Sequence, residues 1–123
     1  MTVKRIVANI DSPRLEDARG FYGGILGLEI VMDFGWILTF AGEGSGAPQI
    51  TIASEGGSGT VVPDLSIEVD NLDEIYRRVL AAGLPVEYGP VDEAWGVRRF
   101  YVRDPFDRLV NILQHNEVAA GRV

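Results

Sequence analysis

The chain has 123 residues, of which 46% are hydrophobic and 24% charged, and its formal net charge is −7. This length suits one ordinary domain, and the apolar content allows a real core and argues against disorder. The acidic balance argues against a nucleic-acid partner, because phosphates need a basic surface, and it is compatible with a cationic ligand. The chain has no cysteine, which excludes a disulfide framework, a thiolate zinc site and a cysteine nucleophile.

Neither a membrane anchor nor a secretory signal is predicted. No apolar run approaches the roughly 18 residues that span a bilayer. Residues 1–5 lack the apolar stretch of a signal peptide. We therefore expect a cytoplasmic protein without a membrane partner.

One pattern occurs twice along the sequence. The first copy leads from Asp11 through an amphipathic segment to Gly27, and the second leads from Asp70 to Gly83 about sixty residues later. A repeat at a fixed period usually reports the architecture of the fold. We predict a single domain of two modules, at about residues 1–56 and 62–115, followed by a tail at 116–123.

The first module is predicted to begin with a strand at residues 3–10. A helix follows, because Leu15, Ala18, Tyr22 and Ile25 recur at helical spacing and form its buried stripe, which Gly27 ends. Three further strands are predicted at residues 28–32, 36–40 and 49–53.

The second module repeats this order with a strand at residues 64–69 and a helix. The helix has its buried stripe at Leu72, Ile75, Val79 and Ala82 and ends at Gly83. Strands at residues 85–88, 97–102 and 109–114 complete the module. The prediction is therefore an α+β fold with the order βαβββ twice.

Three segments carry a resemblance to a known family: Phe21-Tyr22-x-x-Ile25-Leu26-Gly27-Leu28, residues 69–73 and residues 103–110. Over essentially its whole length the chain resembles the vicinal oxygen chelate superfamily, which includes glyoxalase I, extradiol dioxygenases, fosfomycin-resistance enzymes and bleomycin-resistance proteins. The resemblance implies two βαβββ modules that form a half-open barrel around a ligand cavity. It implies no single reaction, because the scaffold serves isomerases, dioxygenases, transferases and binding proteins.

The resemblance also implies positions for a divalent metal, which the superfamily typically holds with histidine, glutamine and glutamate. The matching positions here are Asp64 and Asn111, together with Arg5 or Val7, depending on the alignment. Arginine has no lone pair to donate, valine has no donor atom, and an Asp–Asn remainder suits zinc, nickel or iron poorly. We therefore expect no metal and no cofactor, and we expect the single histidine, His115, at the surface.

Aromatic and polar side chains are the candidate ligand-binding residues. Trp36 and Trp95 occupy comparable places in the two modules and would make flat walls for a planar or cationic ligand, or else would pack in the core or a dimer interface. Phe34, Tyr88 and Tyr101 would extend this wall, although a core position is favoured for Tyr101. Strand alternation places further polar groups on inward positions, which suits a space that holds water or a ligand: Gln49, Thr51, Asp64, Ser66, Glu68 and Asn111.

The first functional interpretation is a metal-free binding protein of the bleomycin-resistance type, with no catalytic residue. It would act as a homodimer and sequester a small aromatic or cationic molecule. The alternative is a glyoxalase-like lyase or isomerase, or a dioxygenase-type enzyme, that works without metal or with a displaced metal. In that case Glu68 or Asp64 would be the general base, and Arg5 or Arg98 would stabilise an oxyanion. A third possibility is a structural or regulatory module whose own side chains fill the cavity.

Overall fold

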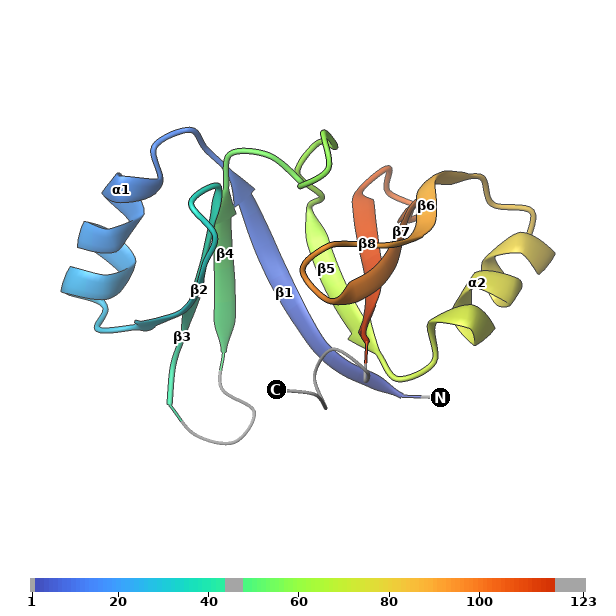
Figure 1. Cartoon of the computed structure of the whole chain (residues 1–123), viewed down its shortest axis with the longest axis horizontal. Helices are drawn as coiled ribbons and strands as arrows, with labels where there is room; N and C mark the ends of the chain where they lie inside the picture. The colour runs from blue at the N-terminus through green and yellow to red at the C-terminus, as the bar shows by residue number, and fades with distance from the viewer. Residues whose placement is uncertain (1, 44–47, 117–123) are drawn as a thin grey trace. The chain divides into compact units, whose positions relative to one another are not determined.

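A computed structural model of the chain describes residues 2–43 and 48–116. The elements follow in the order shown in Figure 1: β1 (Val3–Asp11), α1 (Leu15–Ala18), η1 (Arg19–Ile25), β2 (Glu29–Asp33), β3 (Ile37–Ala41), β4 (Gln49–Ala53), β5 (Leu65–Val69), α2 (Leu72–Ala81), β6 (Val86–Asp92), β7 (Val97–Arg103) and β8 (Leu109–His115). This order confirms the predicted α+β class and the two βαβββ repeats.

The described residues form two compact units. The first unit is Val7–Val62, and the second consists of residues 2–6 and 63–116. Strand β1 contributes its first residues to the second unit and its remainder to the first.

The first unit has the strand order β2-β3-β4-β1. Strand β3 is antiparallel to β2 and β4, and β4 runs parallel to the end of β1, where Ala8 pairs with Ile50. The helical segment packs on one face of these strands through Leu15 and Ala18. The buried cluster of this unit is completed by the strand residues Leu38, Phe40 and Ile52.

The helical segment of the first unit changes character after one turn. From Arg19 it is a π-helix, and the Leu26 N–H donates to the Phe21 carbonyl five residues earlier at 3.0 Å. This wider turn moves Ile25 off the face that carries Leu15, and Ile25 is 74% exposed. The prediction that Ile25 belongs to the buried stripe is therefore wrong, because three-residue spacing returns to one face only in an α-helix.

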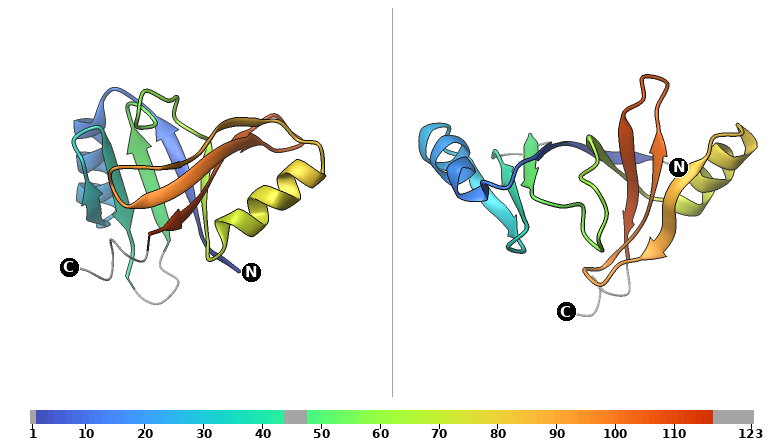
Figure 2. Two further views of the ribbon diagram at one scale, coloured as in Figure 1. Left: turned by 45° about the vertical axis from the view of Figure 1, so that its right-hand side comes forward. Right: turned by 90° about the horizontal axis from the view of Figure 1, so that it is seen from above.

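The second unit has the strand order β1-β5-β8-β7-β6. Strand β5 is parallel to β8, whereas β7 is antiparallel to both β8 and β6. Figure 2 shows α2 on one side of these strands. The buried cluster on that side contains Val69, Leu72, Phe100, Val102, Val110 and Ile112.

Helix α2 begins with two polar contacts. The Asn71 Oδ1 atom accepts the Glu74 N–H at 3.3 Å, and the Leu72 N–H donates to Gln114 Oε1 of β8 at 2.6 Å. The helix has 10 residues. Within residues 2–43 and 48–116, no helix has the length and apolar character needed to cross a membrane.

Gly83 ends α2 in a left-handed conformation. The Gly83 N–H donates to the Leu80 carbonyl at 3.0 Å and the Leu84 N–H to the Val79 carbonyl at 3.2 Å, the paired pattern of a Schellman motif. The φ angle of Gly83 is +76°, a conformation that L-residues with a side chain adopt at a cost.

We predict that Gly83→Ala lowers the free energy of unfolding by about 1–2 kcal/mol because alanine is strained at this φ angle. An added Cβ would meet nothing within 4 Å at either Gly83 or Gly20, and only Gly83 has a positive φ. Gly20→Ala is therefore the matched control, and it should leave the stability unchanged or raise it. Urea unfolding of both variants checks this, and equal losses would contradict it.

Candidate functional site

The second unit carries polar side chains on the sheet face that is turned away from α2. Residues alternate along each strand, and Ile67, Phe100 and Ile112 point toward the helix, so their neighbours point the other way. The register places Ser66, Asn111 and Tyr101 side by side across β5, β8 and β7. The next row on this side contains Glu68 and Arg99, with the buried Leu113 between them. We call this set the polar face: Ser66, Glu68, Arg99, Tyr101 and Asn111.

Asn111 lies at the centre of the polar face and is only 7% exposed. Its Nδ2 atom donates to Ser66 Oγ at 3.1 Å. Its Oδ1 atom is buried and accepts no hydrogen bond from any residue that the structure describes. A buried acceptor without a donor costs about 1–3 kcal/mol, so this atom is the point of the polar face that a ligand or a water molecule would satisfy.

Arg99 and Glu93 form a buried ion pair beside Tyr101. Their side chains are each 4% exposed, and Arg99 Nε lies 2.7 Å from Glu93 Oε2. Arg99 Nη1 donates to the Tyr101 hydroxyl oxygen at 3.0 Å, and the Tyr88 hydroxyl donates to Glu93 Oε2 at 2.8 Å. The two charges therefore compensate each other in a place where either alone would be costly.

Three aromatic rings surround the guanidinium group of Arg99. Its central carbon lies 5.3 Å from the ring centroid of Tyr88, 5.0 Å from that of Trp95 and 5.0 Å from that of Tyr101. The rings of Tyr88 and Tyr101 also contact each other, with centroids 5.2 Å apart. These distances fall within the range of cation–π contacts.

Strand β6 approaches β7 closely beside Arg99 because residue 89 is a glycine. A Cβ at Gly89 would lie 2.5 Å from the Arg99 carbonyl oxygen and 3.2 Å from the Phe100 Cα. Any side chain here would push β6 away from β7. The glycine thus keeps Tyr88, its neighbour on β6, next to Arg99.

Glu68 is the centre of a second charged cluster. Its side chain is 12% exposed, with Oε1 3.0 Å from Arg5 Nε and Oε2 2.7 Å from His115 Nδ1, while Lys4 Nζ lies 4.0 Å away. Burial would raise the pKa of the Glu68 carboxyl, but the hydrogen bond with His115 and the nearby cationic side chains outweigh burial. They hold this pKa below its ordinary value of 4.5.

Two other candidates from the sequence, Asp64 and Trp95, belong to the second unit, and Asp64 is exposed. Its Oδ2 atom accepts the Leu109 N–H at 2.9 Å, which joins the start of β5 to the start of β8. Asp64 therefore has a structural contact in addition to any role with a ligand. Trp95 is half-buried beside Arg99.

The remaining candidates from the sequence belong to the first unit. Thr51 is buried on β4, with its hydroxyl 2.8 Å from that of Thr39, so these two groups satisfy each other. Gln49 is half-buried at the start of the same strand. Phe34 is exposed and its ring centroid lies 6.2 Å from that of the half-buried Trp36. Trp36 and Trp95 thus belong to different units.

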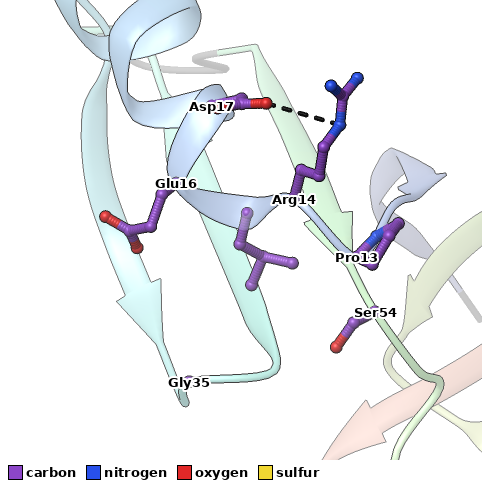
Figure 3. A pocket seen from close by; sticks show the side chains of 7 residues that line it. Pro13, Arg14, Glu16, Asp17, Gly35 and Ser54 are labelled. Atoms are coloured by element: carbon purple, nitrogen blue, oxygen red, sulfur yellow. Dashed lines mark ion pairs between the residues drawn. The ribbon is translucent and has the colours of Figure 1, made fainter.

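A shallow pocket of about 450 Å³ lies in the first unit beside the start of α1 (Figure 3). Arg14 and Asp17 form an ion pair at its rim, with N and O atoms 3.5 Å apart. None of the candidate residues from the sequence lines this pocket. Its lining residues are Pro13, Arg14, Leu15, Glu16, Asp17, Gly35 and Ser54.

No group of three or more histidine, aspartate or glutamate side chains able to hold a metal ion occurs among the residues that the structure describes. The pairing of Arg99 with Glu93 and the contact between Glu68 and His115 were not predicted from the sequence. One signal was available, because Arg99 and Tyr101 are two residues apart on a strand and therefore share a face. The partner of a charged residue, however, cannot be read from alternation.

We predict that Glu68→Gln reduces the loss of stability at acid pH. Because the folded state lowers the pKa of Glu68, its ionisation stabilises the fold above pH 4.5, and this contribution disappears as the pH falls through the lowered pKa. Urea unfolding at pH 7 and at pH 3 should show a smaller difference for Glu68→Gln than for the unchanged protein. The exposed Glu55 provides the control variant Glu55→Gln, and an equal acid loss in all three proteins would contradict the assignment.

Comparison with known proteins places the chain in a family. The model of the Glyoxalase/Bleomycin resistance protein/Dioxygenase superfamily matches residues 7–112. The chain is similar to a solved superfamily member from Vibrio splendidus 12B01, with 17% identity, coverage of 93% of this chain and 99% of the other, and a TM-score of 0.64. It is also similar to methylmalonyl-CoA epimerase from Mycobacterium tuberculosis, with 17% identity, coverage of 97% and 91%, and a TM-score of 0.62.

A third similar structure is described as NAD-dependent benzaldehyde dehydrogenase from Legionella pneumophila, with 15% identity, coverage of 91% of this chain and 100% of the other, and a TM-score of 0.71. At such identities these structures show a shared fold alone. No curated protein matches the sequence. Because the family model matches most of the chain and the βαβββ order is present twice, the chain belongs to the glyoxalase/bleomycin resistance protein/dioxygenase superfamily.

Proposed function

We propose that this chain is a binding protein that captures a small aromatic or cationic molecule stoichiometrically. The observation that carries the proposal is the buried Oδ1 atom of Asn111, which accepts no hydrogen bond within the described residues. A protein that keeps such an atom loses stability unless a bound molecule supplies the donor. The ligand would therefore contribute an O–H or N–H group at this point.

Aromatic surface near Asn111 supports the same proposal. Tyr101 is the register neighbour of Asn111, and the ring of Tyr88 lies against that of Tyr101. Tyr88 and Trp95 are half-buried, and both rings lie against the Arg99 guanidinium group. Flat aromatic surface beside one polar anchor is typical of sites for small ring-containing molecules.

The donor atoms do not fit the divalent metal that the superfamily typically holds. Asn111 offers an amide oxygen, and Asp64 already accepts a backbone N–H at 2.9 Å. Transition metals such as zinc and iron need imidazole, thiolate or several carboxylate ligands. We therefore propose capture that needs no metal, and we derive no catalytic step through one.

A specific observation favours one other function, an enzyme that moves a proton. His115 is 50% exposed and its Nδ1 atom lies 2.7 Å from Glu68 Oε2. If the neutral His115 ring carries its proton on Nδ1 and donates it in a hydrogen bond to Glu68, its Nε2 atom can accept a proton from a substrate. One of the similar structures is an epimerase, a type of enzyme that inverts a stereocentre. An enzyme would convert the bound molecule, whereas a capture protein returns it unchanged.

We also propose that the chain acts as a homodimer. Phe21, Ile25 and Leu26 are large apolar side chains exposed around the end of η1, and Val31 is exposed on the edge strand β2 of the same unit. Exposed apolar patches and open sheet edges are features that protein interfaces cover.

Sedimentation velocity should give twice the chain mass of 13.4 kDa. Ile25→Glu should shift the protein toward the monomer, because a charge would be buried in the interface. Phe106 of the second unit is also exposed, so Phe106→Glu is the matched control and should remain dimeric. A monomeric unchanged protein, or dissociation by Phe106→Glu alone, would contradict the proposal.

We predict that Asn111→Leu weakens binding of an aromatic ligand by about tenfold or more, because the variant lacks the buried oxygen that accepts the ligand's O–H or N–H group. The same variant should change the free energy of unfolding little, since it removes the unsatisfied buried oxygen together with the hydrogen bond to Ser66. NMR titration with bleomycin and with 2-naphthylmethanol measures the binding, and urea unfolding measures the stability.

Gln114→Leu is the control, because Gln114 lies on the same strand and accepts the first N–H of α2. This variant should lose stability and keep its affinity. The proposal would be contradicted if Asn111→Leu destabilised the fold strongly and left binding unchanged.

A further inference from the structure

We propose that Arg99 takes the cation position within a ring of aromatic side chains, and that the polar face therefore binds an uncharged aromatic molecule with an O–H or N–H group. This inference rests on the proposed binding function and narrows its ligand class. The sequence alone left a planar ligand and a cationic ligand as open alternatives. The positions of the charged side chains separate these two cases.

The aromatic rings that would attract a cationic ligand already contact a cation of the protein itself. The guanidinium carbon of Arg99 lies 5.0 Å from the ring centroids of both Trp95 and Tyr101. A ring attracts a cation through the negative charge on its face. A ligand cation placed against these rings would share that attraction with Arg99 and would also be repelled by its charge.

Two acidic groups beside the polar face, Glu93 and Glu68, are compensated as well, and a third, Asp64, is exposed and accepts the Leu109 N–H. Glu93 is buried, and its Oε2 atom receives both Arg99 Nε at 2.7 Å and the Tyr88 hydroxyl at 2.8 Å. Glu68 is shared by three basic side chains, Lys4, Arg5 and His115. Neither carboxylate is therefore available as the counter-ion that a buried ligand cation would require.

What the polar face does offer is a neutral acceptor. Asn111 Oδ1 is an amide oxygen, and it is satisfied by a hydroxyl or amide N–H without any transfer of net charge. An anionic ligand would bring a second acceptor to this atom and would leave it unpaired. The arrangement thus favours an uncharged ring with one donor group over both charged classes.

Three probes with the same ring test this inference: 2-naphthylmethanol, 2-naphthylmethylammonium and 2-naphthoate. NMR titration of the unchanged protein follows the side-chain amide of Asn111 and the indole N–H of Trp95. We expect the alcohol to bind about tenfold more tightly than the ammonium, with the carboxylate weakest. Equal or tighter binding of the ammonium would overturn the inference and leave the binding function intact. The absence of any shift with all three probes would overturn the binding function itself.

Variants of Arg99 test whether its positive charge causes the preference for the uncharged probe over the ammonium probe. The double variant Arg99→Met with Glu93→Met removes both buried charges together and keeps similar volumes, which avoids an unpaired charge in the core. In this double variant the affinity for the ammonium probe should rise relative to that for the alcohol probe by about fivefold or more. Arg99→Lys keeps a cation near the rings and should keep the original preference. An unchanged ratio of affinities in the double variant would show that Arg99 does not set the ligand class.

Discussion

A polar group that leaves water on folding must find a partner, and this constraint organises the second unit. Its sheet has one face packed on α2 with apolar side chains, and on the other face the buried polar Arg99 and Asn111 lie among apolar side chains such as Leu113. Arg99 on that face is compensated within the chain by Glu93 beside it, since each supplies the charge that the other needs. The side chain of Asn111 has only part of its hydrogen bonds, because its amide nitrogen donates to Ser66 whereas its oxygen accepts no hydrogen bond from the described residues. The binding proposal follows from this difference.

Much of the fold could be predicted because its determinants are local. The period-two alternation and the turn residues predicted the bounds of β4 at Gln49–Ala53, and the spacing of Leu72, Ile75 and Val79 predicted α2. Gly83 ends that helix as expected, because a left-handed position after a helix favours glycine. The same alternation places Ser66 and Asn111 on one face, where the register makes them neighbours.

Other features depend on information that spacing does not contain. The α-helical pattern of the first helix continues past Ala18, yet the backbone widens to a π-helix and turns Ile25 outward. Residue types alone do not show which carboxylate a given arginine will meet, so the pairs Arg99–Glu93 and Glu68–His115 came only from the structure. These pairs change the functional interpretation, because they compensate the charges that a cationic ligand would have used.

The metal content of the purified protein tests this account most directly. The superfamily typically uses a divalent metal, whereas the polar face described above offers an amide oxygen and compensated carboxylates. Elemental analysis should be made on protein purified without a histidine tag and without chelators. The account predicts far less than one equivalent of zinc, nickel, iron or manganese per chain. A content close to one equivalent per chain, released only on unfolding, would contradict it and would favour the enzyme.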